Sequence, residues 1–139
     1  MAATTNAHAL GLMRLVRLAS VGNTDTRAPG LDVRQQLVIQ ALGLDGPMPL
    51  HTLADQLALS PSTMTGIADR LEQAGFARRE HAQDRRVTLL QLTPAGEQVF
   101  AKEVDWFGFI VSGTLEQLTP RSARAVSDAL ASFAHPSHS

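Results

Sequence analysis

The sequence contains no cysteine. Disulfide bonds, thiolate metal sites and thiol-based redox sensing are therefore excluded, and a chain without cysteine suits a reducing cytoplasm. No apolar stretch approaches the roughly 20 residues that a membrane-spanning helix needs. We therefore expect a cytoplasmic protein that has no membrane partner.

The sequence also lacks the common signatures of enzymes and metal sites. It has no G-x-S-x-G, no P-loop and no H-E-x-x-H motif. Its five histidines are scattered, and none pairs at helical spacing with a third ligand. Asp69 and Glu72 are two acids on one expected helix, but no histidine or nucleophile accompanies them, so an ion pair from Asp69 to one of the arginines that follow at 78–86 is the better interpretation. We predict no metal, no cofactor and no catalytic residue.

Positive charge is scarce overall but concentrated in one place. The formal net charge is −1, which gives no sign of a nucleic-acid partner by itself. The stretch RREHAQDRRVTLLQL (78–92) nevertheless carries four of the 12 basic residues: Arg78, Arg79, Arg85 and Arg86. Charge in this chain must therefore be interpreted locally.

The 139 residues leave room for one domain, or for a small domain with an extra helical element. The apolar spacing around Leu12 and Val16 fits an amphipathic first helix. The same acid-poor segment also fits an organelle transit peptide, and we favour the helix. A Gly-, Asn-, Asp- and Pro-containing loop follows at 20–30. We divide the chain into an N-terminal part (1–30), a central domain (31–93) and C-terminal helices (94–139).

Three helices and two strands are predicted in the central domain. Apolar residues recur with helical spacing over 33–44 and over 50–59. Ser60 is a good N-cap, Pro61 suits the first helical position and Gly75 is a natural stop, so a third helix lies between them. Two strands, roughly 77–79 and 87–92, follow. The residues expected to face inward are Leu37, Val38, Ala41, Leu42, Leu50, Leu53, Ala54, Leu57, Met64, Ile67, Ala68 and Leu71.

The two helices on either side of Ser60 have the order of a helix-turn-helix unit, whose second helix lies in the DNA major groove. Its exposed N-terminal face carries small residues and hydroxyls that can donate to phosphates or base edges: Ser62, Thr63, Thr65 and Gly66. A basic hairpin beside such a helix can reach the neighbouring minor groove. Asp84 could orient a guanidinium there by a bidentate pair. The alternative is a solvated turn whose charges keep an edge strand soluble. With the preceding helices, DNA binding is the favoured interpretation.

Two further helices are predicted after TPAG (93–96). The long first one has two apolar strips, one that runs from Phe100 to Leu118 and one made of Val99, Trp106 and Ile110. A helix that is apolar on two sides is normally buried against more than one neighbour, and a chain of this size offers few. The last helix would turn Ala123, Val126, Leu130 and Phe133 inward. We therefore expect a homodimer; a well-buried monomeric helix is the alternative.

Residues Leu31 to Gln98 resemble the winged-helix core of the MarR (multiple antibiotic resistance regulator) transcription factors. The resemblance rests on HTLADQLALSPSTMTGIADRLEQAGFARR, on the wing QDRRVTLLQLT with its Asp-x-Arg, and on LTPAGEQVF. It implies a mostly α-helical fold, a winged helix-turn-helix with a two-stranded β wing and N- and C-terminal dimerisation helices. It also implies a homodimeric regulator, with repression as the main interpretation, that binds a palindromic operator in double-stranded DNA and often responds to a small molecule.

The resemblance assigns DNA contacts residue by residue. Ser60 would cap the recognition helix, Arg70 and Arg79 would lie near DNA or the base of the wing, and Asp84 would orient Arg86 in the minor groove. Gly66 stands where many family members carry arginine, which removes a contact and costs the helix about 1 kcal/mol relative to alanine. The wing loop is also slightly short and lacks the usual prolines. The predicted DNA-binding residues are Ser60, Ser62, Thr63, Thr65, Gly66, Arg70, Arg79, Asp84, Arg85 and Arg86.

The resemblance also places a small-molecule pocket where the first helix, the helix over 33–44 and the start of the long helix meet. Apolar walls with a few polar groups suit a small phenolic or aromatic acid, with Arg17 as the carboxylate partner. The alternative is that this region is simply filled core. The predicted ligand-binding residues are Leu12, Val16, Arg17, Gln36, Gln40 and Phe100.

For the protein as a whole, the alternative to a regulator is a winged-helix module that makes only protein contacts, without sequence-specific DNA binding. The near-neutral charge and Gly66 would suit such a module.

Overall fold

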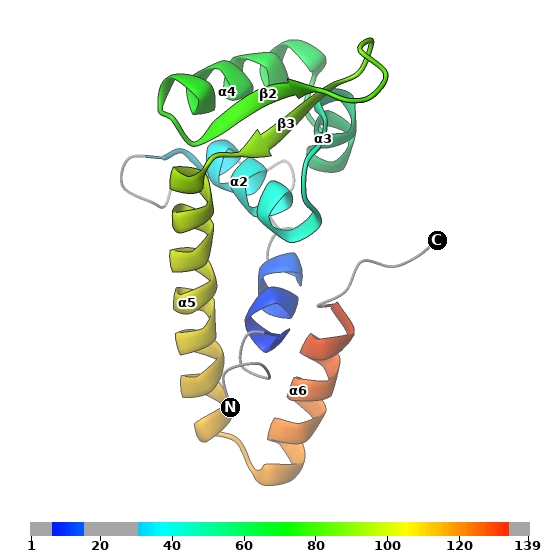
Figure 1. The fold of residues 1–139 in the computed structure, drawn as a ribbon. Coiled ribbons are helices and arrows are strands. Elements are labelled where there is room, and N and C mark those ends of the chain that lie inside the picture. The colour runs from blue at the N-terminus through cyan, green and yellow to red at the C-terminus, as the bar shows by residue number, and fades with distance from the viewer. Residues whose placement is uncertain (1–6, 16–30, 134–139) are drawn as a thin grey trace. The chain divides into compact units, whose positions relative to one another are not determined.

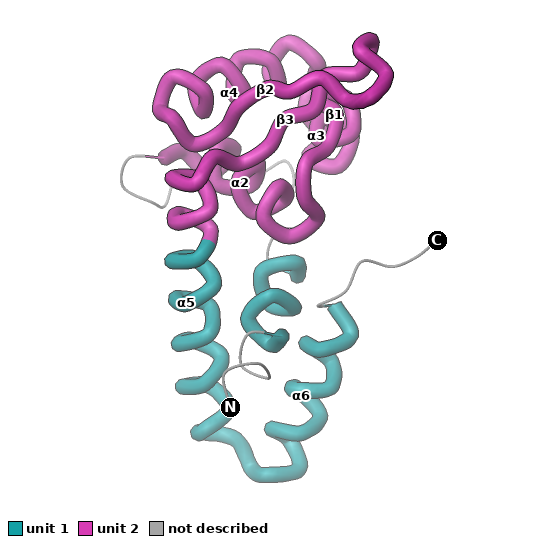
Figure 2. Tube along the Cα trace, in the orientation of Figure 1, with its two compact units in different colours: residues 1–19, 101–139 teal, residues 20–100 magenta. Residues whose placement is uncertain are grey.

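The computed structural model describes residues 7–15 and 31–133 of the chain. It separates into two compact units, one formed by residues 1–19 and 101–139 and the other by residues 20–100 (Figure 2). Among the described residues, no helix is both long enough and apolar enough to cross a membrane.

The unit of residues 20–100 contains the helix-turn-helix and the wing (Figure 1). The sequence-based prediction of three helices followed by a hairpin is confirmed, with α3 ending at Leu57 instead of residue 59 and β2 continuing to His81. In chain order its elements are α2 (Val33–Asp45), β1 (Met48–Pro49), α3 (Leu50–Leu57), α4 (Pro61–Gln73), β2 (Ala77–His81), β3 (Thr88–Leu92) and the start of α5 (Pro94–Glu116).

The sheet has a third strand that the sequence analysis did not assign. Its order is β1-β3-β2, and both pairings are antiparallel. Met48 pairs with Leu90 and Pro49 with Leu89. A two-residue strand is too short to show an alternating pattern, and Pro49 is acceptable there because β1 is an edge strand. The predicted two-stranded wing is therefore extended by a strand that pairs with the middle of β3 and leads directly into α3.

The core of this unit is built from the apolar faces of α2, α3 and α4 and from the sheet. Of the inward-facing residues predicted, all but the half-buried Leu50 are buried. Ile39 and Gln40 of α2 are buried as well, because α3, α4 and β3 contact this helix on several sides. The buried cluster consists of Leu37, Val38, Ile39, Ala41, Leu42, Met48, Leu53, Ala54, Leu57, Met64, Ile67, Ala68, Leu71, Ala77 and Leu90.

Local signals at both ends fix the position of α4. The side-chain oxygen of Ser60 accepts a hydrogen bond from the backbone N–H of Thr63, and Pro61 occupies the first helical position. At the other end, the N–H of Gly75 donates to Glu72 and that of Phe76 donates to Leu71. These two bonds form a Schellman motif, and Gly75 takes the left-handed conformation that it requires, with φ at +83°.

A junction ties the end of α4 to the beginning of α5. The hydroxyl of Thr93 donates to the carbonyl of Gly75 and accepts from the N–H of Gly96. The N–H of Thr93 donates to the carbonyl of Phe76. A Cβ at Gly96 would lie only 2.0 Å from that carbonyl oxygen, so the close approach of α5 to the α4–β2 turn requires glycine.

The other unit contains a helix over residues 7–15, the later part of α5, and α6 (Pro120–Phe133). Its buried apolar residues are Ala9, Met13, Phe107, Val111 and Leu130. Trp106, predicted to lie in a strip that a partner subunit covers, is 59% exposed in the single chain, and Phe109 is 78% exposed. Val126 and Phe133 of α6, also predicted to face inward, are exposed as well. Within one chain these apolar side chains have too few neighbours to cover them.

Two single substitutions test the turns that bound the helix-turn-helix. Nothing lies within 4 Å of a Cβ placed on Gly75, so Gly75→Ala should reveal the backbone cost alone and lower the free energy of unfolding by about 1–2 kcal/mol. Ala58, in the α3–α4 turn, also has a left-handed backbone, with φ at 55°. Ala58→Gly should therefore raise the free energy of unfolding, by up to about 1 kcal/mol.

Urea unfolding followed by circular dichroism measures both changes as shifts of the midpoint at constant m-value. Shifts in the same direction for the two variants would contradict this account of the turns.

Candidate nucleic-acid interface

The N-terminal turn of α4 carries a connected group of hydroxyls. Ser60 donates to the hydroxyl of Thr63 at 2.8 Å and lies 3.3 Å from the hydroxyl of Ser62. Thr65 donates to the backbone carbonyl of Pro61 at 3.0 Å. Because these bonds orient the hydroxyls without consuming all of their lone pairs and protons, the turn can still donate to and accept from an external partner.

Exposure separates the members of this group. Ser60, Ser62 and Thr65 are exposed, whereas Thr63 is half-buried. Gly66, on the same helix, has no atom within 4 Å of the position that a Cβ would take. The exposed face of the helix is therefore flat at this point, and the protein itself would not prevent a larger side chain there.

The four arginines of the basic stretch have different surroundings. Arg79 on β2 is bound to two acids of α4, with one terminal nitrogen 2.8 Å from Asp69 Oδ1 and the other against Glu72 Oε1. The predicted ion pair from Asp69 to a wing arginine is thereby confirmed. Arg78, on the opposite face of the strand, lies 3.2 Å from Glu80.

Arg85 and Arg86 lie at the tip of the wing, where both are exposed. The turn is closed by hydrogen bonds from the N–H of Ala82 to Val87 and from the N–H of Val87 to Asp84. One oxygen of Asp84 accepts from both the backbone N–H and the Nε–H of Arg86, at 3.1 and 3.3 Å. Asp84 thus orients Arg86 as predicted. The prediction of a bidentate pair is wrong, because only one carboxylate oxygen accepts, from Nε and the backbone N–H. The guanidinium keeps its outer edge in solvent, and the Arg86 side chain is 92% exposed.

Arg70, in the last turn of α4, is placed near the start of α2. A terminal nitrogen lies 4.0 Å from Asp32 Oδ2, and both side chains are well exposed. Asp32 already caps α2 through a capping box with Gln35. An exposed pair at this distance contributes little stability, so the Arg70 charge stays available to a polyanion.

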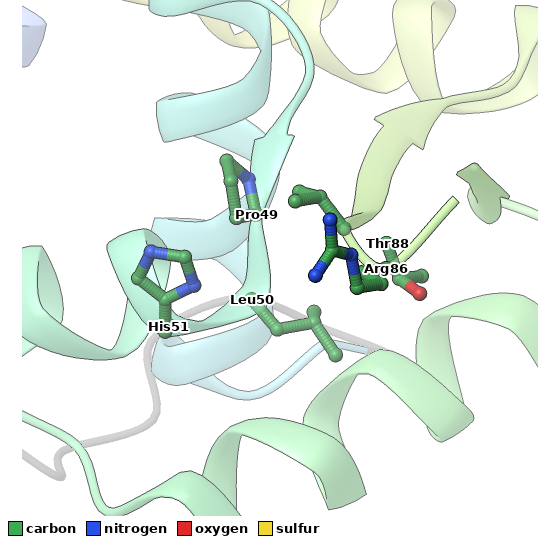
Figure 3. Close-up of a pocket in the computed structure, with 6 residues that line it drawn as sticks. Pro49, Leu50, His51, Arg86 and Thr88 are labelled. Carbon is green, nitrogen blue, oxygen red and sulfur yellow. The ribbon is translucent and has the colours of Figure 1, made fainter. Parts of the chain in front are cut away.

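A pocket of about 270 Å³ lies between the start of α3 and the end of β3 that is nearer the wing tip. Leu50 and His51 reach it from the first turn of α3, and Arg86 and Thr88 reach it from the end of the wing (Figure 3). This pocket is not apparent from the sequence, because strand β1, which brings its wall next to β3, has no sequence pattern of its own. The sequence signal that bears on β1 is Pro49, which favours an extended backbone just before α3.

The residues of the predicted small-molecule pocket come from both units, Leu12 from one and Gln36, Gln40 and Phe100 from the other. Val16 and Arg17 are outside the described residues. Gln36 is half-buried and Gln40 is buried in α2, while Leu12 is half-buried in the first helix. Phe100 packs against the core cluster. A Cβ on Gly43 would meet the Phe100 ring at 2.3 Å, so this ring fills space against α2.

A comparison with known families and proteins agrees with this geometry. The MarR family model matches residues 32–88, which span the helix-turn-helix and the wing up to the first residue of β3. The chain is 28% identical over 120 residues to the uncharacterized HTH-type transcriptional regulator YfiV of Bacillus subtilis, covering 85% of this chain and 75% of YfiV. It is 36% identical over 72 residues to the HTH-type transcriptional repressor MdtR of the same organism. That match covers 51% of this chain and 46% of MdtR.

A solved structure shares the fold. The crystal structure of Streptococcus pneumoniae FabT in complex with DNA matches with a TM-score of 0.65, covering 87% of this chain and 83% of that one. The sequence identity is 18%, so this likeness concerns the fold alone. The family model, the regulators that match in sequence and the shared winged-helix architecture agree: residues 32–88 of the chain are similar to the MarR family of transcriptional regulators.

Proposed function

We propose that the protein is a cytoplasmic homodimeric regulator that binds a palindromic operator in double-stranded DNA and represses transcription. The observation that carries the proposal is the pairing, in one compact unit, of a recognition helix with an exposed hydroxyl face and a wing with two exposed arginines. Helix and wing together offer both kinds of contact that sequence-specific binding uses, base edges in a groove and the phosphate backbone.

The two structural parts of the interface have different roles in this proposal. Ser62, Thr65 and the cap Ser60 of α4 face the major groove, where short side chains allow a close approach. Arg85 and Arg86 enter the neighbouring minor groove, which attracts arginine most strongly where A·T-rich sequence narrows it. Arg70 contributes a phosphate contact. The similarity to the repressor MdtR supports the same type of function by likeness.

Dimerisation supplies the two-fold symmetry that a palindrome needs. Trp106 and Phe109 on α5, with Val126 and Phe133 on α6, are large apolar side chains that one chain leaves exposed. Large exposed apolar patches mark protein interaction sites, and a second copy of the chain would cover them.

Removing the wing guanidinium tests the DNA contact. Arg86→Ala should weaken binding to a duplex obtained by selection from random sequences by about 1–3 kcal/mol, because a minor-groove cation is lost. Fluorescence anisotropy at several salt concentrations gives the affinity and the salt slope.

Arg121→Ala is the matched control, since Arg121 is an exposed arginine of α6 in the other unit. Equal affinities of the Arg86→Ala variant and the wild type at moderate salt would refute the minor-groove role. Wild-type affinity that does not vary with salt would favour the alternative of a protein-interaction module.

The assembly can be tested separately. The protein should sediment as a dimer at micromolar concentration, and its selected DNA site should have half-sites about 10 bp apart. Phe109→Glu should shift the equilibrium towards the monomer, because it places a charge in a desolvated interface. Thr114→Glu, at an exposed position on another face of the same helix, should leave the dimer intact. A wild-type monomer would contradict the proposed assembly.

We also propose that a small phenolic or aromatic acid releases the DNA. The proposal rests on the family resemblance, on the polar side chains of Gln36 and Gln40 on α2 and on the positive charge of Arg17 in the sequence. A ligand can release DNA only if it binds the DNA-incompetent state more tightly.

Salicylate at millimolar concentration should therefore dissociate the complex of wild-type protein and selected duplex, and Arg17→Ala should blunt this response. If no member of a series of such acids dissociates the complex, the effector site should be abandoned.

A further inference from the structure

We propose that Arg79 is a positioning and charge-masking residue for DNA binding, and that it acts on the recognition helix without touching DNA. The inference rests on the proposed function and deepens it. It gives Arg79 the role of masking negative charge on the recognition helix, and Arg85 and Arg86 the role of contacting DNA. The starting observation is the contact of one guanidinium with two carboxylates of α4.

The geometry leaves Arg79 little capacity for a DNA contact. One terminal nitrogen is bound to Asp69 and the other to Glu72, so both prongs of the guanidinium fork are occupied by carboxylates. Recognition of phosphate or of guanine by arginine uses the same fork. The side chain is 28% exposed, against 92% for Arg86. Arg79 is thus directed into the protein, towards the helix that is expected to enter the groove.

The position of Asp69 gives this contact a functional meaning. Residues three and four apart are neighbours on a helix surface, so Asp69 continues the stripe of Ser62, Thr65 and Gly66. The Asp69 side chain is 53% exposed. A free carboxylate on this stripe would approach the phosphates of bound DNA, and like charges brought together across an interface are strongly unfavourable. Arg79 offsets that charge: two carboxylates and one guanidinium sum to −1, whereas the two carboxylates alone sum to −2.

The same contact also joins the wing to the recognition helix. Arg79 lies on β2 opposite Leu90 of β3, so its side chain reaches α4 from the middle of the sheet. Asp69 and Glu72 are three residues apart on α4, and a single guanidinium spans both. Loss of Arg79 would therefore affect DNA binding in two ways, through uncovered negative charge and through a looser angle between wing and helix.

Replacing the charged side chains by uncharged ones of similar size separates these two effects from a direct contact of Arg79 with DNA. The probe is a duplex selected from random sequences by the wild-type protein, and its affinity is measured by fluorescence anisotropy at fixed salt. Arg79→Met should weaken binding about tenfold or more, because it leaves two carboxylates uncompensated. Arg79→Met combined with Asp69→Asn and Glu72→Gln should return the affinity to within about threefold of wild type, because it removes the repulsion. Asp69→Asn alone should bind at least as tightly as wild type.

Rescue by the triple variant, together with undiminished binding by Asp69→Asn, supports the inference, because a merely structural ion pair predicts weaker binding in both. Thermal unfolding of each variant and the salt dependence of binding complete the measurement. A triple variant as weak as Arg79→Met, with a salt slope lowered by about 1, would mean that Arg79 itself contacts a phosphate and would overturn the inference alone. Unchanged binding by Arg79→Met would overturn it too. Failure of the wild-type protein to select any duplex would instead refute the proposed function.

Discussion

The junction between the α4–β2 turn and the first turn of α5 holds the DNA-binding unit in its shape. Gly75 turns the chain out of the recognition helix with a left-handed backbone, and Thr93 then fastens that turn to α5 through its own hydroxyl. Gly96 lets the two backbones approach to a distance that no larger residue tolerates. The recognition helix, the sheet that carries the wing and the start of the long helix all meet at this point. Rotating any one of these elements would therefore strain or break the hydrogen bonds of Thr93 to the α4–β2 turn and to α5.

Most of this architecture follows from short-range features of the sequence. Ser60 with Pro61 marks a helix start, Gly75 marks its end, and the helical spacing of apolar residues identifies the faces that α3 and α4 bury. These features act between near neighbours in the chain, which is why they can be interpreted without a structure. The same holds for the Asp84–Arg86 contact, which spans only two residues.

The features that the sequence did not reveal depend on contacts distant in the chain. Strand β1 exists because Met48 and Pro49 lie beside β3, some 40 residues later, and two residues carry no periodic signal of their own. The pocket beside His51 depends on that pairing. In the candidate interface, the sequence singled out Arg79, Arg85 and Arg86 of the basic stretch but could not distinguish their roles. Arg79 and Arg86 differ in their partners, which the sequence does not show. Trp106 shows the converse, because an apolar pattern predicts burial without saying whether the covering surface belongs to the same chain.

The distribution of charge explains how a chain of net charge −1 can present a surface to a polyanion. At physiological salt, charges interact over about 8 Å, so a DNA backbone senses the groups within a few side chains of it and not the net charge of the molecule. In this protein the acids of α4 are drawn to Arg79 at the base of the wing, while the wing tip keeps its guanidinium groups in solvent. Asp84 lies at that tip too, yet a single oxygen holds Arg86 by its Nε and its backbone, which fixes the direction of the side chain and leaves its outer nitrogens available. Arg79 thus offsets negative charge on the recognition helix, whereas Arg85 and Arg86 extend from the wing tip into solvent. That division supplies a locally positive edge that the overall composition does not show.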